Sequence, residues 1–484
     1  MKTDEEFAAW LESNTALRCM LFEVGSSSGT RYLSNTMYNS SSVTTRYEAV
    51  VAGGLQVQES ISMDADASLS VGDIEIYNNG GERDAWLDDV WANQPVLAFL
   101  GDVRWDRADF RQVFKGVIID IGCKSRDRLN LCLTNQLERL NTPVTDVKVG
   151  GNATNPDALV PMLLGEGSNF TPVQTNPNTL EYAFGGTERL IEARLDGKPR
   201  EITVDLAGGR FKFTSSVEGG QVTCSAQGIK YNGAYVNTIG KLVQYLVTQC
   251  GKASTRFTVD ELDTAQLVAF EAAHPQPVGL PLLERTNVLV AVQQLASSVG
   301  AQLVPSMAGK LRLIQFAIPT SASIEIRPSQ QIDSPSDRIA IVKRTEVQAA
   351  VKVGYNRNWT VQANLPTSLP LAHKDLYSKE WLSVTSTDAA VQAAYKLDAE
   401  PPQIDTCLLR RADAQAEADR RLAIVKVPRT TYRFKATAGQ LLTELGSAVK
   451  LFSDRFGLAA GKPGLVTSRS VDRGTLRVTM EVTV

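Results

Sequence analysis

The chain contains 484 residues, of which 43% are hydrophobic, and this length predicts about three or four domains rather than one. Fifty Lys and Arg residues stand against 53 Asp and Glu residues, and the resulting net charge of −3 disfavours a dedicated nucleic-acid binder. The sequence has only two histidines, His274 and His373, which lowers the expectation of a hydrolase or a metalloenzyme.

The N-terminal segment MKTDEEFAAWLESN predicts a short amphipathic helix within residues 1–16. Thr3 followed by Glu6 is a capping-box pattern, and Phe7, Trp10 and Leu11 then share one helical face. The segment lacks the basic start and apolar core of a signal peptide, and no later stretch supplies the ~20 apolar residues of a membrane-spanning helix. We therefore expect a soluble chain, made in the cytoplasm, with no membrane span.

Residues 17–142 contain seven short strand-like runs separated by tight turns, which predicts a β-barrel or sandwich. In the run FRQVFKGVIIDIG the apolar residues Val113, Val117, Ile119 and Ile121 have the same parity, so they are expected on one face. Gly116 interrupts this run and predicts a bulge or bend. Such a strand suits a curved, closed sheet.

Residues 143–180 are rich in Pro, Asn and Gly and are expected to form an extended connector with one apolar island, LVPMLLG. Strand alternation then resumes over 181–235. Turn signals at Asp196-Gly197, Gly208-Gly209 and Gly219-Gly220 predict a small antiparallel domain there.

Residues 236–320 predict an α+β domain with two helices. One helix is capped by Asn237 or Thr238 and ends at Gly251, and the other is capped by Thr286 or Asn287 and ends at Gly300. Residues 321–484 are β-rich again, with one helix over Arg411–Leu422 that we expect to be solvated or subunit-facing. The predicted class is therefore mainly β with an α+β insertion.

Two carboxylate clusters are candidates for glycoside hydrolysis, which needs one protonated acid and one ionised carboxylate at a fixed separation. They comprise Asp64 and Asp66 and then Asp84, Asp88 and Asp89. A solvated surface is the favoured interpretation, with Asp88 and Asp89 in a turn. His274 and His373 are interpreted as loop histidines, because neither has a second histidine or a nucleophile elbow nearby.

The six cysteines form no C-x-x-C pair and are interpreted as buried apolar thiols. They are Cys19, Cys123, Cys132, Cys224, Cys250 and Cys407. A metal cluster assembled from distant cysteines stays open as an alternative. Trp86, Trp91 and Trp105 fall close together, and either a sugar-stacking platform or, more commonly, a barrel rim or subunit interface would use them. No catalytic, cofactor-binding or metal-binding residue is assigned, and no cofactor is expected.

Taken in order, several segments resemble the baseplate hub or tail-tip proteins of long-tailed bacteriophages and related gene transfer agents. The matching text includes VPMLLGEGSNFTPV, LIEARLDGKPREITVDLAGGRFKFTSSVEGGQVTCSAQG, VGLPLLERTNVLVAVQQLASSVGAQLVPSMAGKLRLIQF, VKVGYNRNWTVQ, ADAQAEADRRLAIVKVPRTTYRF and LGSAVKLFSDRFGL, with GDVRWDRADFRQVFKGVIIDI near the N-terminus. The resemblance covers most of residues 45–484. It rests on the order of these segments along the chain and on their residue patterns, with no catalytic motif. It implies two tube-type β-barrel domains, one over 17–142 and one over 321–484, around inserted domains.

The resemblance further implies a homotrimer in the virion, at the distal end of the tail, whose six barrels continue a sixfold tail tube into a threefold tip. Its expected partners are a distal tail protein, the C-terminus of the tape-measure protein, and central tip or receptor-binding fibre proteins. Viral DNA would pass through the lumen without specific binding. Two alternatives remain: a hexameric distal tail protein with one barrel per chain, and a tip-borne glycan-binding or cell-wall-degrading protein.

Overall fold

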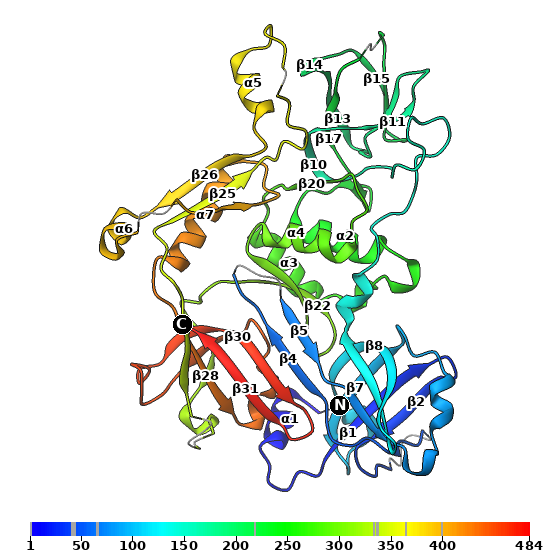
Figure 1. The fold of residues 1–484 in the computed structure, drawn as a ribbon. Coiled ribbons are helices and arrows are strands. Elements are labelled where there is room, and N and C mark those ends of the chain that lie inside the picture. The colour runs from blue at the N-terminus through cyan, green and yellow to red at the C-terminus, as the bar shows by residue number, and fades with distance from the viewer. Residues whose placement is uncertain are drawn as a thin grey trace. The chain divides into compact units, whose positions relative to one another are not determined.

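The computed structural model describes residues 2–39, 45–63, 67–216, 219–332, 334, 338–363, 365–397 and 400–484, and the chain divides into two compact units. Unit 1 comprises Met1–Arg139, Gln302–Thr345 and Pro428–Val484, and unit 2 comprises Leu140–Ala301 and Glu346–Val427. Both units contain antiparallel β-sheets, and the longer helices occur in unit 2 (Figure 1). The predicted class, mainly β with α+β insertions, is confirmed.

The first sheet of unit 1 has the strand order β3-β2-β1-β7-β8-β9-β6. Its strands are β1 (Arg18–Ser26), β2 (Gly29–Ser34), β3 (Glu48–Ala49), β6 (Ile74–Tyr77), β7 (Pro95–Asp102), β8 (Arg111–Ser125) and β9 (Arg128–Asn135). The segment after β3 also bonds β6, since the Ala52 N–H donates to the Glu75 carbonyl and the Tyr77 N–H to the Val50 carbonyl, both at 2.8 Å. The sheet therefore closes into a barrel, which removes its free edges.

Strand β8 shows why the expected common face is only partly realised. Val113 and Val117 are buried as predicted, but Ile119 is 55% exposed. The pairing with β9 shifts between Ile118 and Asp120, so Ile119 is the extra residue of a bulge and points outward. Gly116 is not itself the bulge. It is needed because a Cβ there would lie 2.4 Å from the Thr134 carbonyl oxygen.

The predicted N-terminal helix is α1 (Asp4–Leu11), and its capping box is formed, with the Thr3 hydroxyl accepting from the Glu6 N–H and the Glu6 carboxylate accepting from the Thr3 N–H. Its apolar face is buried in the core of unit 1, where Trp10 lies 4.7 Å from Trp105 between ring centroids. Because burial of this face removes apolar surface from water, the helix is an integral part of the barrel.

The second sheet of unit 1 uses strands from both ends of the chain. It follows the order β23-β29-β30-β31-β28-β24, and β4 pairs with β30 and with β5. The strands are β4 (Gln56–Ser60), β5 (Ser68–Val71), β23 (Ile324–Ile326), β24 (Ala340–Arg344), β28 (Thr430–Ala436), β29 (Ala448–Leu451), β30 (Lys462–Asp472) and β31 (Arg477–Thr483). The β4–β5 hairpin, placed by its sequence position within the first barrel, thus belongs to the C-terminal sheet (Figure 1). One apolar core runs through both sheets.

Unit 2 contains a five-stranded sheet in the order β14-β13-β17-β10-β20 and a four-stranded sheet in the order β11-β12-β16-β15. Their strands are β10 (Met162–Phe170), β11 (Val173–Asn176), β12 (Glu181–Ala183), β13 (Arg189–Leu195), β14 (Lys198–Pro199), β15 (Ile202–Asp205), β16 (Arg210–Phe213), β17 (Val222–Gln227) and β20 (Gly279–Leu282). The expected connector over 143–180 therefore holds β10 and β11. Its glycines indicated a loop, but Gly165 lies within β10 and is required there, because a Cβ would lie 1.9 Å from the Val278 carbonyl oxygen.

The helices of unit 2 are α2 (Ile239–Gln249), α3 (Thr264–Ala273), α4 (Val288–Ser297), α5 (Leu371–Ser378), α6 (Ala389–Tyr395) and α7 (Arg411–Val425). The two helices predicted for 236–320 correspond to α2 and α4, and the predicted C-terminal helix to α7, whereas α3, α5 and α6 were not predicted. Helix α7 is not a solvated helix, because Glu417 and Arg421 are buried and paired at 2.6 Å.

Three small sheets complete the strands. The sheet β26-β25-β27 comprises β25 (Ala350–Tyr355), β26 (Leu382–Thr387) and β27 (Gln403–Asp405). Two ribbons pair β18 (Lys230–Tyr231) with β19 (Ala234–Tyr235), and β21 (Ala301–Pro305) with β22 (Leu311–Gln315). The β21–β22 pair is the hairpin expected at the end of the α+β segment.

Candidate functional site

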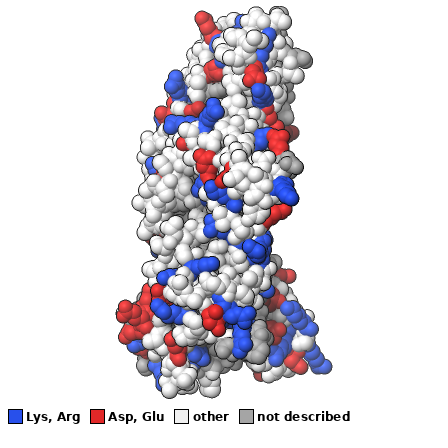
Figure 2. All heavy atoms as spheres, turned by 90° about the vertical axis from the view of Figure 1, so that its left-hand side faces the viewer, with Lys and Arg blue, Asp and Glu red and all other residues white. Residues whose placement is uncertain are grey.

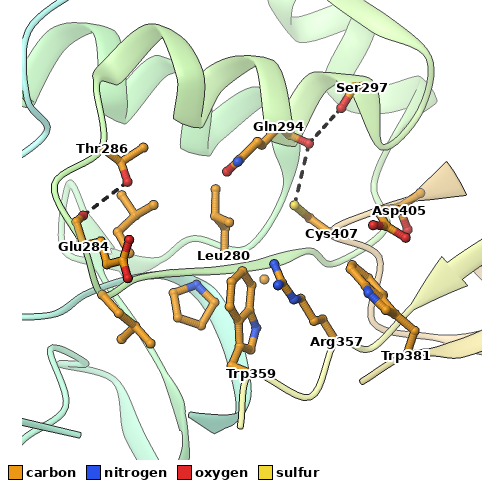
Figure 3. A pocket seen from close by; sticks show the side chains of 15 residues that line it. Leu280, Glu284, Thr286, Gln294, Ser297, Arg357, Trp359, Trp381, Asp405 and Cys407 are labelled. Carbon is orange, nitrogen blue, oxygen red and sulfur yellow. Dashed lines mark hydrogen bonds between the residues drawn. The ribbon is translucent and has the colours of Figure 1, made fainter. Parts of the chain in front are cut away.

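A pocket of about 520 Å³ lies within unit 2 and is a candidate site. Its walls are β20 with the turn that follows it, helix α4, the loop after β25, the residue before β26 and the end of β27 (Figure 3). The lining residues are Gly279, Leu280, Pro281, Leu282, Leu283, Glu284, Thr286, Gln294, Ser297, Arg357, Trp359, Trp381, Asp405, Thr406 and Cys407. The volume falls within the range of roughly 300–1,000 Å³ that is typical of small-ligand sites.

Strand β20 forms one wall because only part of its second edge is paired. One edge bonds β10, and on the other the Gly279 N–H donates to the Cys407 carbonyl at 2.9 Å. Pro281 follows two residues later and has no N–H to offer. Proline is tolerated in a strand whose N–H side is not needed for the ladder, so it marks this edge of β20 as open.

Helix α4 is held in place by polar contacts at its C-terminal end. Arg421 of α7 donates to the Ser297 carbonyl at 2.8 Å, and the Ser298 hydroxyl accepts from the Cys407 N–H at 2.8 Å. The Cys407 thiol donates to the Gln294 carbonyl at 3.6 Å. These bonds satisfy carbonyls in the last turn of the helix and fix the wall that carries Gln294.

The loop after β25 is positioned by a buried asparagine. Asn358 accepts from the Asn169 side chain of β10 at 2.8 Å and donates to the Tyr377 carbonyl at 2.9 Å. Alternate residues of an extended segment point to opposite sides, so anchoring Asn358 presents Arg357 and Trp359 together on the other side. Both line the pocket.

Arg357 lies between the indoles of Trp359 and Trp381, as Figure 3 shows. Its guanidinium carbon is 4.2 Å from the Trp359 ring centroid and 5.3 Å from that of Trp381, which are cation–π distances. One terminal nitrogen donates to Glu380 at 2.9 Å, while Nε has no hydrogen-bond partner. Nε is buried, but the side chain as a whole is 37% exposed, and a guanidinium has five N–H donors, so its terminal nitrogens keep donors for a ligand.

The pocket lacks an activated nucleophile. Burial raises the pKa of Cys407 to about 11, although the Ser298 hydrogen bond and the nearby Arg357 charge lower it in part. The thiol is therefore protonated near neutral pH and is a poor nucleophile. Asp405 accepts from the Gln403 amide at 2.8 Å. Within the described ranges, no group of three His, Cys, Asp or Glu side chains is arranged to hold a metal ion.

Of the acidic candidates, Asp84, Asp88 and Asp89 lie in the part of the chain that the structure describes, and these three do not form a hydrolytic pair. Asp64 and Asp66 lie outside the described residues. Asp84 accepts from the Asn78 amide at 2.8 Å within a turn. Asp89 follows in the same region, and hydrogen bonds from Ser28 and then Arg31 lower its pKa, so that it stays ionised and cannot act as a general acid. Asp88 is exposed in this turn, as expected.

Neither histidine lines the pocket. His274 ends α3 and stacks against Phe270 at 4.5 Å between ring centroids. His373 lies within α5 and makes an edge contact with Tyr377. The expectation of a loop was wrong for His373, because Pro370 occupies the N-cap of α5, where a missing N–H costs nothing.

Most of the cysteines, together with Trp86, Trp91 and Trp105, have a structural role in packing. Cys19, Cys224 and Cys250 are buried as expected, Cys132 and Cys407 are partly exposed, and the expectation was wrong for Cys123, which is exposed. Trp86 and Trp91 are 8% and 2% exposed and lie 6.0 Å apart, whereas Trp105 packs on Trp10 instead. These rings belong to the core of unit 1 and offer no open stacking platform.

The pocket tryptophans, Trp359 and Trp381, were not identified from the sequence. The only local signal is Arg357 two residues before Trp359, in the text NRNWT. The rest of the lining comes largely from β20 and α4, more than 60 residues earlier, and no short-range pattern links these segments.

Charges on the surface are mixed, as the balanced composition led us to expect. On the face drawn in Figure 2, Lys and Arg side chains alternate with Asp and Glu over a largely uncharged surface. A continuous basic stripe, which phosphate-backbone binding requires, is not seen on that face. No helix among the described residues is long and apolar enough to cross a membrane.

No family model matches the chain, and no curated protein matches it. Solved structures similar to it include the tail protein from Neisseria meningitidis MC58, with 11% identity over 96% of this chain and 95% of that one at a TM-score of 0.42. The 43 kDa tail protein of prophage MuSo2 from Shewanella oneidensis aligns with 11% identity over 96% and 98% at 0.37. A chain from the virion of a native gene transfer agent particle aligns with 13% identity over 71% and 90% at 0.45.

Proposed function

We propose that this chain is a structural protein of a phage-type tail, namely a baseplate hub that assembles as a homotrimer at the distal end of the tail. The observation that carries the proposal is that unit 1 holds two curled, largely antiparallel sheets with one common core. Two barrel-like domains per chain suit three copies around a sixfold tube, whereas one barrel per chain would suit six.

The six-part division of the chain, with tube-type domains over 17–142 and 321–484, belongs to this proposal. So do the partners: a distal tail protein, the tape-measure C-terminus, and central tip or fibre proteins. The balanced surface charge supports a lumen that lets DNA pass without retention, because basic walls bind phosphates through counterion release. A scaffold of this kind requires no catalytic group.

An exposed strand supports assembly through unit 1. Within the described residues β24 bonds only to β28, and it exposes Ile341 (45%) and Val342 (39%). Apolar side chains on a free sheet edge favour contact with another protein surface. We expect this edge to be covered in the assembled tail.

The proposal is tested by copy number. Purified protein measured by native mass spectrometry, together with electron microscopy of particles, should give three copies and threefold density at the tail end. Ile341→Glu should shift the mass toward the monomer, while Val361→Glu, which changes a similarly exposed valine in unit 2, should not. Six copies would support the alternative of a hexameric distal tail protein. A monomer that is absent from particles would exclude both the hub and the distal tail protein.

A further inference from the structure

The pocket of unit 2 has a ligand chemistry of its own, separate from any structural role in a tail. We propose that it binds a neutral saccharide. Three observations carry this inference: hydrogen-bonding groups of both kinds in the lining, a wall with two indoles, and a lining whose charge is unsuited to polyanions.

The hydrogen-bonding groups match a polyhydroxylated ligand, which must both donate and accept. The Arg357 guanidinium and the Gln294 amide supply donors, while the carboxylates of Glu284 and Asp405 supply acceptors. Figure 3 shows Gln294 on α4 and Arg357 below it, with Glu284 and Asp405 toward opposite ends of the pocket. A saccharide carries hydroxyls on every ring, so it can engage donors and acceptors on more than one wall of the pocket.

The wall of Trp359, Arg357 and Trp381 is rigid before any ligand arrives. Cation–π contacts on both sides hold the guanidinium, and Asn358 holds the loop. Arg357 covers one face of each indole, and the parts of the two rings that line the pocket beside it offer apolar surface to the carbon-bound hydrogens of a sugar. Preorganisation of this kind lowers the entropy lost on binding.

The charge of the lining argues against the competing ligands. Glu284 and Asp405 are both exposed, and Arg357, the one cation among the described lining residues, already bonds Glu380. Two carboxylates against one paired cation repel nucleic acid and phosphate-rich polymers. An extended peptide added to the open edge of β20 would meet Pro281, which cannot donate to a ladder.

The test is a binding screen of the full-length purified chain on an array of neutral and anionic glycans, followed by calorimetry with the best neutral oligosaccharide. Gln294→Ala and Asp405→Ala should each weaken binding by about tenfold or more. Gln293→Ala changes the neighbouring glutamine, which does not line the pocket, and should leave the affinity unchanged. The measurement needs no particles, so it is independent of the proposed place in a tail.

Three results would overturn the inference. The first is the absence of binding to every neutral glycan. The second is an affinity that Gln294→Ala and Asp405→Ala leave unchanged in folded protein, as judged by circular dichroism. The third is tighter binding of single-stranded DNA, an anionic glycan or an extended peptide, each of which would assign the pocket to a different ligand class.

Discussion

Asp102 is the residue whose replacement should most clearly separate buried electrostatics from packing in the first barrel. It is fully buried at the end of β7. Its Oδ2 accepts from Trp10 Nε1 and the Leu17 N–H, both at 2.9 Å, and from Arg104 at 2.7 Å. Its Oδ1 accepts from Arg104 Nε at 2.6 Å. Helix α1 and the start of β1 are thus fixed to β7 through one carboxylate.

The expected loss can be worked out from these contacts. Asp102→Ala leaves three donors without their acceptor: the buried Trp10 indole N–H and the partly buried backbone N–H groups of Leu17 and Arg104. A fully buried donor costs about 1–3 kcal/mol, and a partly buried one costs less because water can reach it. The Arg104 side chain is 57% exposed, so water replaces the carboxylate there and the loss of this ion pair adds little. We expect the free energy of unfolding of the barrel to fall by about 4 kcal/mol, from about 2 kcal/mol for the buried donor and about 1 kcal/mol for each of the other two. In Asp102→Asn the amide oxygen can take the place of Oδ2 and keep both the Trp10 and the Leu17 donors, so only the charge-assisted part of these bonds is lost, at about 1 kcal/mol.

The measurement is native-state hydrogen exchange of the amides of β1 and β7 in increasing urea, because two units in one chain need not unfold together. Trp10→Phe removes the indole donor and keeps an aromatic ring, and a double-mutant cycle with Asp102→Ala should show a coupling of about 1–2 kcal/mol. Asp127→Ala, at an exposed turn of the same barrel, is the control. A loss below about 1 kcal/mol, or no coupling to Trp10, would refute the reasoning.

The same carboxylate has a pH signature. Burial by itself raises the pKa of Asp102, but hydrogen bonds from Arg104 and Trp10 outweigh it and hold the pKa well below its usual range. A carboxyl whose pKa is lowered on folding contributes stability above its unfolded pKa of about 3.9, and that contribution is lost as the pH falls toward the folded value. The difference between wild type and Asp102→Asn should therefore be full at about pH 6 and should narrow below about pH 4. A difference that stays constant from about pH 6 to about pH 2 would contradict this.

Three further outcomes are expected. An alkylating reagent at about pH 8 should label exposed Cys123 in the folded protein but Cys224 only after unfolding, because burial raises the pKa of the Cys224 thiol well above its usual value. Peptide mass spectrometry measures the two labelling rates, and equal rates in the folded protein would refute the prediction. Gly165→Ala should destabilise unit 2 by about 3 kcal/mol, because φ of Gly165 is +69° and a Cβ there would overlap the Val278 carbonyl oxygen. Gly122→Ala is the control, because a Cβ at Gly122 has nothing within 4 Å, and it should not destabilise unit 1. Urea unfolding measures both effects. Arg473→Met should raise the free energy of unfolding of unit 1 by about 1 kcal/mol, because Arg473 is buried, two of its nitrogens have no hydrogen bond, and burial lowers its pKa to about 10. If the free energy of unfolding instead falls by more than about 1 kcal/mol, the charge of Arg473 is stabilising.

Local features of the fold could be predicted because their causes are local. The capping box of α1 and the apolar periodicity of α2 and α4 lie within a single turn or face, and the structure contains all three helices. The strand β10 could not be predicted, because its glycines serve contacts with the Val278 segment more than 100 residues away. The prediction for Ile119 was wrong for a related reason: a bulge changes the face, and only the partner strand reveals it.

The candidate site was less accessible to sequence reasoning than the fold. Trp86, Trp91 and Trp105 are close in sequence, but in the structure they belong to two separate packing groups. Trp359 and Trp381 are 22 positions apart and meet only across Arg357. A site assembled from a strand edge, a helix and three loops depends on tertiary pairing, which periodicity does not encode.

Strand β4 can complete its pairing only after a strand from the far end of unit 1 has been synthesised. Residues 56–60 pair with residues 468–472 of β30, which are synthesised about 400 residues later. Closing a loop of this length is a slow, high-contact-order step. The N-terminal barrel can form its own sheet during synthesis, but the edge of β4 that pairs with β30 stays unpaired until β30 has been made. Deletion of β30 and β31 would therefore also leave β4 without its partner strand.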